Sequence, residues 1–285
     1  MKVLVLGVTG MLGSTLFREF SADSNFQVWG TLRNPVGRKY FSDVNQFGLL
    51  SHIDVLNTDD LVSVLEQVRP DVVVNCVGLI KQLADAKNPL TALPINAMFP
   101  HRLASLCALV GARLIHISTD CVFSGRKGMY VEGDVSDAED LYGKSKFIGE
   151  LNDSIHAITL RTSIIGHELD SSESLLDWFL SQKGSTKGYV KAIFSGLPTI
   201  ELTRVIKEYV IPMPELNGLY HVSTAPIDKL SLLKLVAGAY QKEIEIVPDD
   251  RIRIDRSLDS TQFQQTTGYV PPSWPELVRI MQASG

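Results

Sequence analysis

Short β-branched runs alternate with longer amphipathic segments along the first 165 residues of the chain. The runs predict strands, and the segments between them predict helices because their apolar residues recur at helical spacing. Strands separated by helices form right-handed βαβ crossovers, which imply a doubly wound parallel sheet covered on both faces. The predicted strands are Lys2–Leu6, Gln27–Leu32, Val72–Cys76, Arg113–Ser118 and Ala157–Arg161, and the predicted helices are Met11–Phe20, Asp59–Val68, Ala92–Val110 and Tyr142–Asn152.

The rhythm changes after about residue 165, where helices and strands become shorter and less regular. Neither a low-complexity linker nor an internal repeat separates this part from the first, so we expect a smaller α/β region at 166–285 that is interleaved with the domain at 1–165. The pattern predicts helices at Leu175–Leu180, Glu201–Val210 and Lys229–Tyr240, strands at Gly218–Val222 and Ile244–Val247, an aromatic-rich segment with glycine breaks at Lys187–Ser195, and a proline-marked turn at Gly268–Pro275 before a last helix.

Composition narrows the class of protein without naming a function. The 285 residues carry a net charge of −5 and include no basic block, which argues against a nucleic-acid partner. No apolar run approaches the roughly 20 residues that span a bilayer, and Met1–Leu6 meets Gly7 too soon for a signal peptide. Three cysteines, Cys76, Cys107 and Cys121, suit a reducing compartment. We therefore expect a cytoplasmic protein without a membrane partner, and no His, Cys and Asp spacing suggests a metal site.

A glycine-rich turn follows the first predicted strand and opens the first predicted helix. It reads Gly7-Val8-Thr9-Gly10-Met11-Leu12-Gly13, a G-x-x-G-x-x-G spacing. Glycines let the backbone approach a pyrophosphate, whose charge then meets the free N–H groups at the helix N-terminus. The alternative is a plain strand-to-helix turn, but the position of the motif favours a dinucleotide.

The end of the second predicted strand bears on the choice of dinucleotide. NAD sites usually place an acidic residue there for the ribose 2′-hydroxyl, whereas this chain reads Gly30-Thr31-Leu32-Arg33-Asn34. Arg33 can pair with a 2′-phosphate, and the alternative is a solvated loop arginine. The sequence therefore favours NADP, with NAD left open.

Tyr142 and Lys146 lie four residues apart in a predicted helix, so both project from one face. A lysine there can lower the pKa of the phenol from about 10, and a phenol tuned in this way can give a proton to a carbonyl oxygen. Thr119 ends a strand at the carboxyl edge of the sheet, where ligands gather, and its hydroxyl can bond the same oxygen. Alone, each feature also has an ordinary explanation, as a chance pair or a helix cap.

The glycine turn, Thr119 at the end of its strand and the Tyr142–Lys146 pair together resemble the extended short-chain dehydrogenase/reductases. Ser118–Gly125 reads S-T-D-C-V-F-S-G and is similar to S-T-D-Y-V-F-D-G of the dTDP-4-dehydrorhamnose reductases, and Leu160–Ser163 and Gly218–Val222 resemble later segments of that family. The resemblance covers essentially the whole chain. It implies an NADP-binding Rossmann domain with the catalytic residues at 1–165, and a mainly substrate-binding region at 166–285.

The resemblance also implies an activity and a role for each matching residue. Hydride would pass from NADPH to the C4 carbonyl of a nucleotide-linked 4-keto-6-deoxyhexose, for surface-polysaccharide biosynthesis, in a monomer or homodimer. Tyr142 would be the general acid, Lys146 its partner and a ribose ligand, and Thr119 a hydrogen-bond donor to the carbonyl. The implied cofactor contacts are Gly7, Thr9, Gly10, Met11, Leu12, Gly13 and Arg33, with Asp54 and Val55 at adenine and Cys76, Val77 and Gly78 at the ribose.

The residues expected beside the sugar are Asn96, Cys121, Phe123 and His167, and here the chain departs from the family. Cys121 stands where the reductases have tyrosine and the related 4,6-dehydratases have glutamate, which argues against a dehydratase. Cysteine at this position and the pair Gly166-His167 resemble GDP-fucose synthases, so an epimerase-reductase that uses Cys121 and His167 is one alternative. Another is a non-catalytic NADP-binding regulatory subunit, because the regulatory β subunit of methionine adenosyltransferase resembles the same reductases.

Overall fold

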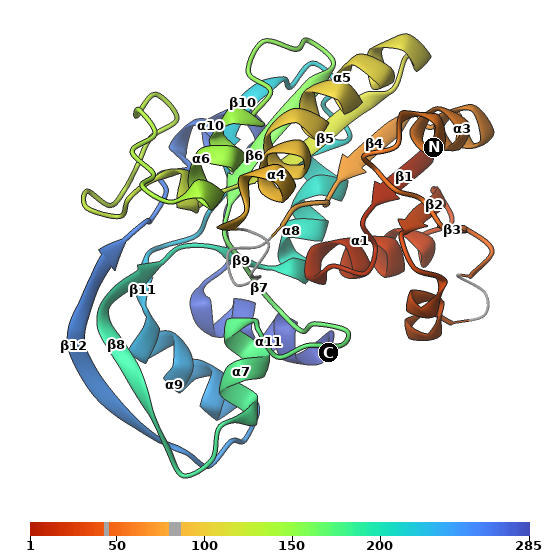
Figure 1. Ribbon diagram of the computed structural model, residues 1–285. Helices are drawn as coiled ribbons and strands as arrows, with labels where there is room; N and C mark the ends of the chain where they lie inside the picture. Colours follow the sequence, from red (N-terminus) through yellow and green to blue (C-terminus); the bar gives the residue numbers. More distant parts are fainter. Residues whose placement is uncertain (43–45, 80–86) are drawn as a thin grey trace.

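A seven-stranded parallel sheet forms the centre of the computed structural model, which describes residues 1–42, 46–79 and 87–285 (Figure 1). All neighbouring strands are parallel, and helices cover both faces, which confirms the predicted doubly wound Rossmann-type α/β fold. In spatial order the strands are β10 (Gly218–His221), β6 (Ala157–Thr162), β5 (Arg113–Thr119), β4 (Val72–Asn75), β1 (Lys2–Leu6), β2 (Gln27–Leu32) and β3 (Leu49–Ser51).

The two faces of the sheet have separate hydrophobic cores because strand side chains alternate. In β1, Val3 and Val5 belong to the core beneath α1 (Met11–Ser21), whereas Leu4 and Leu6 belong to the core beneath α3 (Thr58–Val68). Strands buried on both faces read as continuous apolar runs, which made β1 and β4 easy to predict.

The helices largely match the predicted ones, although π-helical turns interrupt or extend two of them. The predicted helix over 92–110 is divided by a π-helical turn at Leu93–Met98, where Pro94 lacks the N–H that an α-helix needs. The predicted helix over 142–152 ends at Ile148. The remaining helices are α4 (Pro89–Ala92), α5 (Phe99–Val110), α6 (Leu141–Ile148), α7 (Leu175–Ser181), α8 (Thr199–Val205) continued by a π-helical turn at Ile206–Val210, α9 (Lys229–Ala239), α10 (Thr261–Thr267) and α11 (Trp274–Ala283), with 3₁₀ turns at Pro35–Tyr40 and Asp120–Val122.

A smaller three-stranded sheet lies in the second half of the chain, with β8 (Ser185–Phe194) between β11 (Ile227–Asp228) and β12 (Glu245–Asp255). The strand predicted at Ile244–Val247 is much shorter than β12, and β8 was predicted only as an aromatic-rich segment. Edge strands tolerate charged residues, and β12 is mostly exposed, so its polar composition concealed it. A further short pair joins β7 (Ile164–Ile165) and β9 (Leu197–Pro198).

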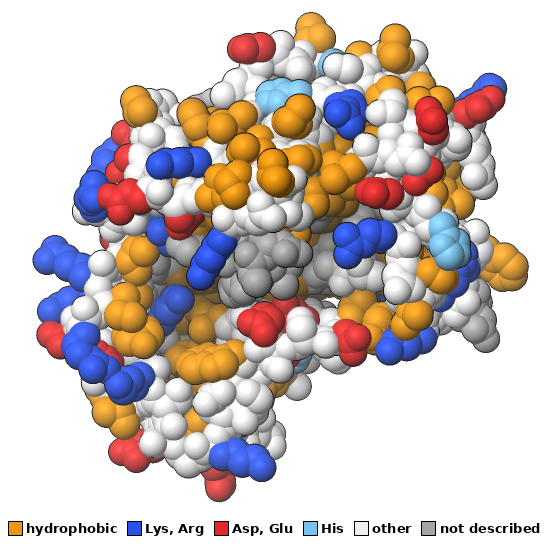
Figure 2. All heavy atoms as spheres, in the orientation of Figure 1, with side chains coloured by type: hydrophobic (Ala, Val, Ile, Leu, Met, Phe, Trp, Pro, Cys, Tyr) orange, Lys and Arg blue, Asp and Glu red, His pale blue; other side chains and the backbone are white. Residues whose placement is uncertain are grey.

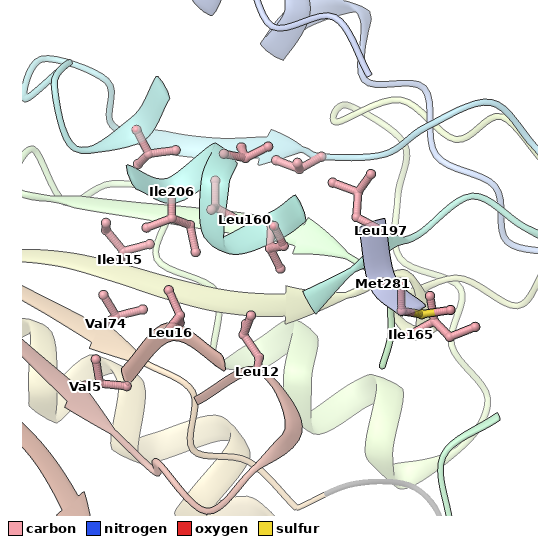
Figure 3. Packing of buried hydrophobic residues seen from close by; sticks show 14 of the residues in the cluster. Val5, Leu12, Leu16, Val74, Ile115, Leu160, Ile165, Leu197, Ile206 and Met281 are labelled. Atoms are coloured by element: carbon pink, nitrogen blue, oxygen red, sulfur yellow. The ribbon is translucent and has the colours of Figure 1, made fainter. Parts of the chain in front are cut away.

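Segments after residue 165 belong to the layers of the main sheet. β10 pairs with β6 at one edge, and α8 packs against α1. Figure 3 shows Leu12 of α1, Ile165 and Met281 in the same buried cluster, so one core extends from the first strand to the last helix. The division into a cofactor region and a substrate region at residue 165 stays a prediction.

The outer surface carries an apolar area above α4, α5 and α6 (Figure 2). Leu90, Met98, Phe147 and Ile148 are exposed there, and apolar surface of this kind is typical of protein contacts. Whether the chain is a monomer or a homodimer stays a prediction. Within residues 1–42, 46–79 and 87–285, no helix is both long and apolar enough to cross a bilayer.

Candidate functional site

The carboxyl ends of the central strands bring most of the predicted site residues together. Gly7 follows β1, Cys76 follows β4 and Thr119 ends β5, and these three strands are neighbours in the sheet. Because the strands are parallel, their carboxyl ends lie at one edge, where open α/β sheets bind ligands. The N-termini of α1 and α6 lie at the same edge.

The glycine turn has a geometry that only glycine permits. Gly7 has φ +84°, in the left-handed region, and its N–H donates to the Thr31 hydroxyl at 3.2 Å. A Cβ on Gly13 would lie 2.2 Å from the Gly7 carbonyl oxygen. The start of α1 therefore lies so close to the turn that no side chain fits between them. The first-turn N–H groups of Met11, Leu12 and Gly13 have no partner within the helix, and free N–H groups at a helix N-terminus attract anions. Thr9 and Gly10 are exposed beside them.

We expect Gly13→Ala to lower the free energy of unfolding by about 1–3 kcal/mol, because the new methyl group displaces the turn. Gly238→Ala in α9 is the matched control, since nothing lies within 4 Å of its added Cβ. In a helix this control should gain up to about 1 kcal/mol. Urea denaturation measures the free energy of unfolding of both variants. Equal stabilities would contradict the close approach of α1 to the Gly7 carbonyl.

Three basic residues follow β2, and their surroundings differ. Arg33 is exposed, and within the part of the chain that the structure describes its guanidinium makes neither a hydrogen bond nor an ion pair. Arg38 instead donates to the Ser51 hydroxyl at 2.8 Å and to the Leu49 carbonyl at 2.5 Å, so it fastens β3. Lys39, which the sequence reasoning missed, lies 4.7 Å from the Tyr40 ring centroid.

The segments predicted at adenine and ribose lie along the same edge. The exposed Asp54 carboxylate accepts from Leu56 N–H at 3.0 Å and leaves a second oxygen toward solvent. Val55 is half-buried beside it. Burial raises the pKa of the Cys76 thiol to about 12, so this thiol is a neutral lining group. The following Val77 side chain touches Gly7, and Gly78 faces Lys146.

Helix α6 begins at Leu141 because Asp140 caps it, with its carboxylate accepting from Gly143 N–H at 2.8 Å. A Cβ on Gly143 would lie 2.2 Å from the Cys121 carbonyl oxygen. This glycine therefore lets α6 lie directly on the segment after β5. The partly exposed Tyr142 phenol is thereby placed within hydrogen-bonding reach of the Thr119 hydroxyl.

The charge of Lys146 does not act on the phenol as the spacing predicted. Burial raises the pKa of Tyr142 above its usual range, a nearby negative charge at Cys121 would raise it further, and the Thr119 hydrogen bond opposes both. Lys146 donates to the Ile117 carbonyl at 2.7 Å instead. Burial also lowers the pKa of Lys146 to about 8. At neutral pH the phenol is thus firmly protonated.

Thr119 has a neighbour that the sequence reasoning missed. Its hydroxyl accepts from Cys121 N–H at 3.1 Å and donates to the Asp120 carboxylate at 3.2 Å. Burial raises the pKa of Asp120, while the charge of Arg256 and several hydrogen bonds lower it. The sequence did carry a signal for this contact, because an acidic residue directly follows the candidate catalytic threonine.

Cys121 lines a cavity of about 350 Å³ whose other lining residues include Ser124, Glu139, Asp140 and Arg256. Burial, together with Asp120, raises the pKa of the Cys121 thiol to about 12. Arg256 follows β12, far along the chain, and its Nε donates to the Phe123 carbonyl at 2.7 Å. The second half of the chain therefore supplies a cation to this cavity, which no local pattern predicted.

The structure corrects the predicted sugar contact of Phe123. Its side chain is fully buried and stacks on Tyr130 with ring centroids 4.1 Å apart. Arg161 lies over the same ring at 5.2 Å. Phe123 is therefore a core residue, and its carbonyl holds the Arg256 side chain that lines the cavity.

Asn96 is buried and fully engaged by protein groups. Its amide nitrogen donates to the Leu79 carbonyl and the Ser145 hydroxyl, both at 3.2 Å, and its oxygen accepts from Leu79 N–H at 2.9 Å. Both amide hydrogens are thus used. Asn96 fastens the segment after β4 to α6 and has no hydrogen left for a sugar.

His167 lies between α7 and α9 rather than beside Cys121. Its Nδ1 bonds to the Asp177 carboxylate at 2.8 Å and its Nε2 to the Tyr240 hydroxyl at 3.0 Å. No contact among the described residues joins His167 to Cys121. Within those same residues, no group of three or more His, Cys, Asp or Glu side chains is arranged to hold a metal ion.

A buried ion pair behind the site was also missed. Glu150, four residues after Lys146, accepts from Arg161 Nε at 2.7 Å and Nη2 at 2.6 Å, and from the Ser118 hydroxyl at 2.7 Å. Arg161 Nη1 donates to His221 Nε2 at 3.2 Å. The pair ties the end of α6 to β5, β6 and β10.

Solved structures share this fold over the whole chain. A dTDP-4-dehydrorhamnose reductase from Bacillus anthracis in complex with NADP has a TM-score of 0.80 and 22% identity, covering 100% of this chain and 99% of that chain. A hypothetical dTDP-4-dehydrorhamnose reductase from Sulfolobus tokodaii has a TM-score of 0.78 and 23% identity, covering 96% and 98%. At these identities the likeness shows the fold alone.

Sequence relatives carry two kinds of name. Methionine adenosyltransferase 2 subunit beta of Rattus norvegicus is 30% identical over 175 residues, 60% of this chain and 49% of the relative. "Probable low-salt glycan biosynthesis reductase Agl14" of Haloferax volcanii is 32% identical over 152 residues, 53% of this chain and 48% of the relative. The chain spans about half the length of these curated relatives. The model of the RmlD substrate binding domain family matches residues 1–283, and the chain belongs to that family.

Proposed function

We propose that the protein is an NADPH-dependent reductase of the 4-keto group of a nucleotide-linked 4-keto-6-deoxyhexose. The observation that carries the proposal is the position of the Tyr142 phenol, beside Thr119 at the sheet edge that also holds the glycine turn. Reduction of a carbonyl needs a proton donor close to the carbonyl oxygen, and a phenol at this edge can supply that proton.

The residues of the edge fit a bound dinucleotide phosphate. The free N–H groups at the start of α1 would hold the pyrophosphate, and the exposed Arg33 guanidinium suits a 2′-phosphate. Asp54 and Gly78 would lie at the adenine and ribose, and Lys146 would bond the ribose hydroxyls. The cofactor supplies hydride when bound. Tyr142 then donates its proton to the sugar oxygen.

Substrate binding would involve the second half of the chain, in line with the predicted role of 166–285. Arg256 already lines the cavity at Cys121. Burial lowers the pKa of Lys229 at the start of α9, and the nearby charge of Asp120 opposes this shift. Two cations beside the reacting edge suit a substrate that carries a diphosphate. The fully buried Phe123 is not part of this proposal.

The geometry favours simple reduction over epimerisation followed by reduction. Removal of a proton next to a ketone needs a base, and the Cys121 thiol, with its pKa raised to about 12, is neutral at physiological pH. Both nitrogens of His167 are bonded to Asp177 and Tyr240. Neither residue is available as the base.

A second candidate is a subunit that binds NADP without catalysis. The relatives named methionine adenosyltransferase 2 subunit beta support it, since one from Danio rerio is 29% identical over 84% of this chain. The presence of Thr119, Tyr142 and Lys146 together supports catalysis instead, because binding alone does not require all three.

The deciding experiment measures NADPH oxidation against dTDP-, GDP- and UDP-linked 4-keto-6-deoxy sugars. We expect turnover with at least one of them at a kcat of about 1 s⁻¹ or more, and tighter binding of NADPH than of NADH. Tight NADPH binding without turnover of any sugar would overturn the reductase in favour of the second candidate.

A further inference from the structure

The hydroxyl of Thr119 makes two hydrogen bonds within its own segment, and the Tyr142 phenol lies within reach of its remaining lone pair. The Thr119 hydroxyl has one proton to donate and accepts through its lone pairs. One lone pair takes Cys121 N–H at 3.1 Å, and the proton goes to the Asp120 carboxylate at 3.2 Å. In this arrangement Thr119 cannot also donate to a substrate carbonyl.

Asp120 lies among groups that favour opposite protonation states of its carboxyl. Burial disfavours the ionised form, whereas nearby donors and a cation favour it. Its pKa is raised above the usual range as a result. The titratable and polar groups that face it come from five parts of the fold, namely Thr119 and Cys121 on its own segment, Ser163 after β6, Arg256 after β12, Lys229 in α9 and Tyr142 in α6.

We propose that Asp120 is a positioning residue that sets the direction of the Thr119 hydrogen bond. Ionised Asp120 holds the Thr119 proton. Protonated Asp120 donates to Thr119 Oγ1, and the Thr119 proton then turns outward to the carbonyl oxygen that Tyr142 protonates. Asp120 keeps its own proton throughout, so the proton consumed in the reduction still comes from Tyr142. The inference rests on the reductase function proposed above.

The two protonation states of Asp120 determine the direction in which kcat/KM changes with pH. As the pH falls through the pKa of Asp120, Thr119 becomes a second donor to the developing alkoxide, so kcat/KM rises. One such donor is worth about 10²–10³-fold in rate where it is fully used. Tyr142 stays protonated over the pH range in which Asp120 titrates, because the pKa of Tyr142 is also raised. Its titration therefore does not mask the rise in kcat/KM.

Asp120→Asn tests the direction of the bond. The Arg256 charge draws the amide oxygen, which leaves the amide N–H₂ facing Thr119 and imitates the protonated acid. We expect this variant to reduce the sugar at the low-pH rate of the parent at every pH tested, and to lose the pH-dependent rise. Asp250→Asn, in an exposed ion pair with Lys191, is the matched control and should keep the rise. A rise retained in Asp120→Asn would overturn the proposal.

A second measurement does not depend on turnover. Carbon-13 carboxyl NMR of aspartate-labelled protein follows Asp120, whose signal is the one missing from Asp120→Asn. Thr119→Val removes a donor to the carboxylate and should raise the pKa of Asp120 by about one unit, whereas Thr119→Ser keeps the hydroxyl and should not. An equal pKa in the Val and Ser variants overturns the inference. The expected shift without turnover of any sugar would overturn only the reductase function.

Discussion

Tyr142→Phe is expected to lower kcat for sugar reduction by about 10²–10⁴-fold, the usual contribution of a general acid. In the proposed reaction the phenol is the proton donor, and its ring remains in the variant, so packing on α6 changes little. The NADPH dissociation constant should change less than about twofold, since one hydroxyl is removed outside the pyrophosphate site. Steady-state kinetics and NADPH fluorescence titration measure the two effects.

Tyr209→Phe is the control for loss of a tyrosine hydroxyl, because Tyr209 packs against Tyr269, away from the sheet edge. It should keep the parent kcat within about twofold. Full activity of Tyr142→Phe would remove the proton-donor role from Tyr142. A parallel loss of NADPH binding would point to a structural role instead.

Arg161→Ala is expected to lower the free energy of unfolding by about 3–5 kcal/mol. Arg161 and Glu150 are both almost completely buried, with side-chain exposures of 2% and 1%. Removal of the guanidinium leaves the Glu150 carboxylate buried without its counter-ion, and it also removes the contact with the Phe123 ring. Urea denaturation at neutral pH measures the loss.

Arg126→Ala is the matched control, because Arg126 pairs with Glu139 at the surface and both side chains are about 70% exposed. Exposed pairs contribute at most about 1 kcal/mol. Equal losses in the two arginine variants would show that burial does not decide the strength of the Glu150 pair. Replacement of both Glu150 and Arg161 by apolar residues should recover much of the stability, since no unpaired charge then remains.

The central sheet was largely predictable from local patterns. β1 has the predicted bounds, since a strand buried on both faces shows as an unbroken apolar run. β2 also has the predicted bounds, although its first half is partly exposed. β12 was mostly missed because a solvent-exposed strand can carry charges along most of its length. β3 escaped the strand prediction because it has only three residues.

The candidate site was predictable where a motif is local. Thr119, Tyr142 and the glycine turn come together as the βαβ order required. His167 lies away from Cys121 because its ring is bonded to Asp177 and Tyr240. Asn96 lies beside α6, but Leu79 and Ser145 take its amide hydrogens. Such bonds join segments far apart in the chain, and no local pattern records them.

Hydrophobic periodicity and the glycine spacing were sufficient for the fold class and for the edge at which chemistry occurs, because both follow from interactions between near neighbours in the chain. The tertiary structure decided the state of the groups at that edge. Burial, rather than the four-residue spacing of Lys146, sets the pKa of Tyr142. Arg256 reaches Asp120 from the far end of β12. Charge and desolvation act through space, so the order of residues alone does not determine them.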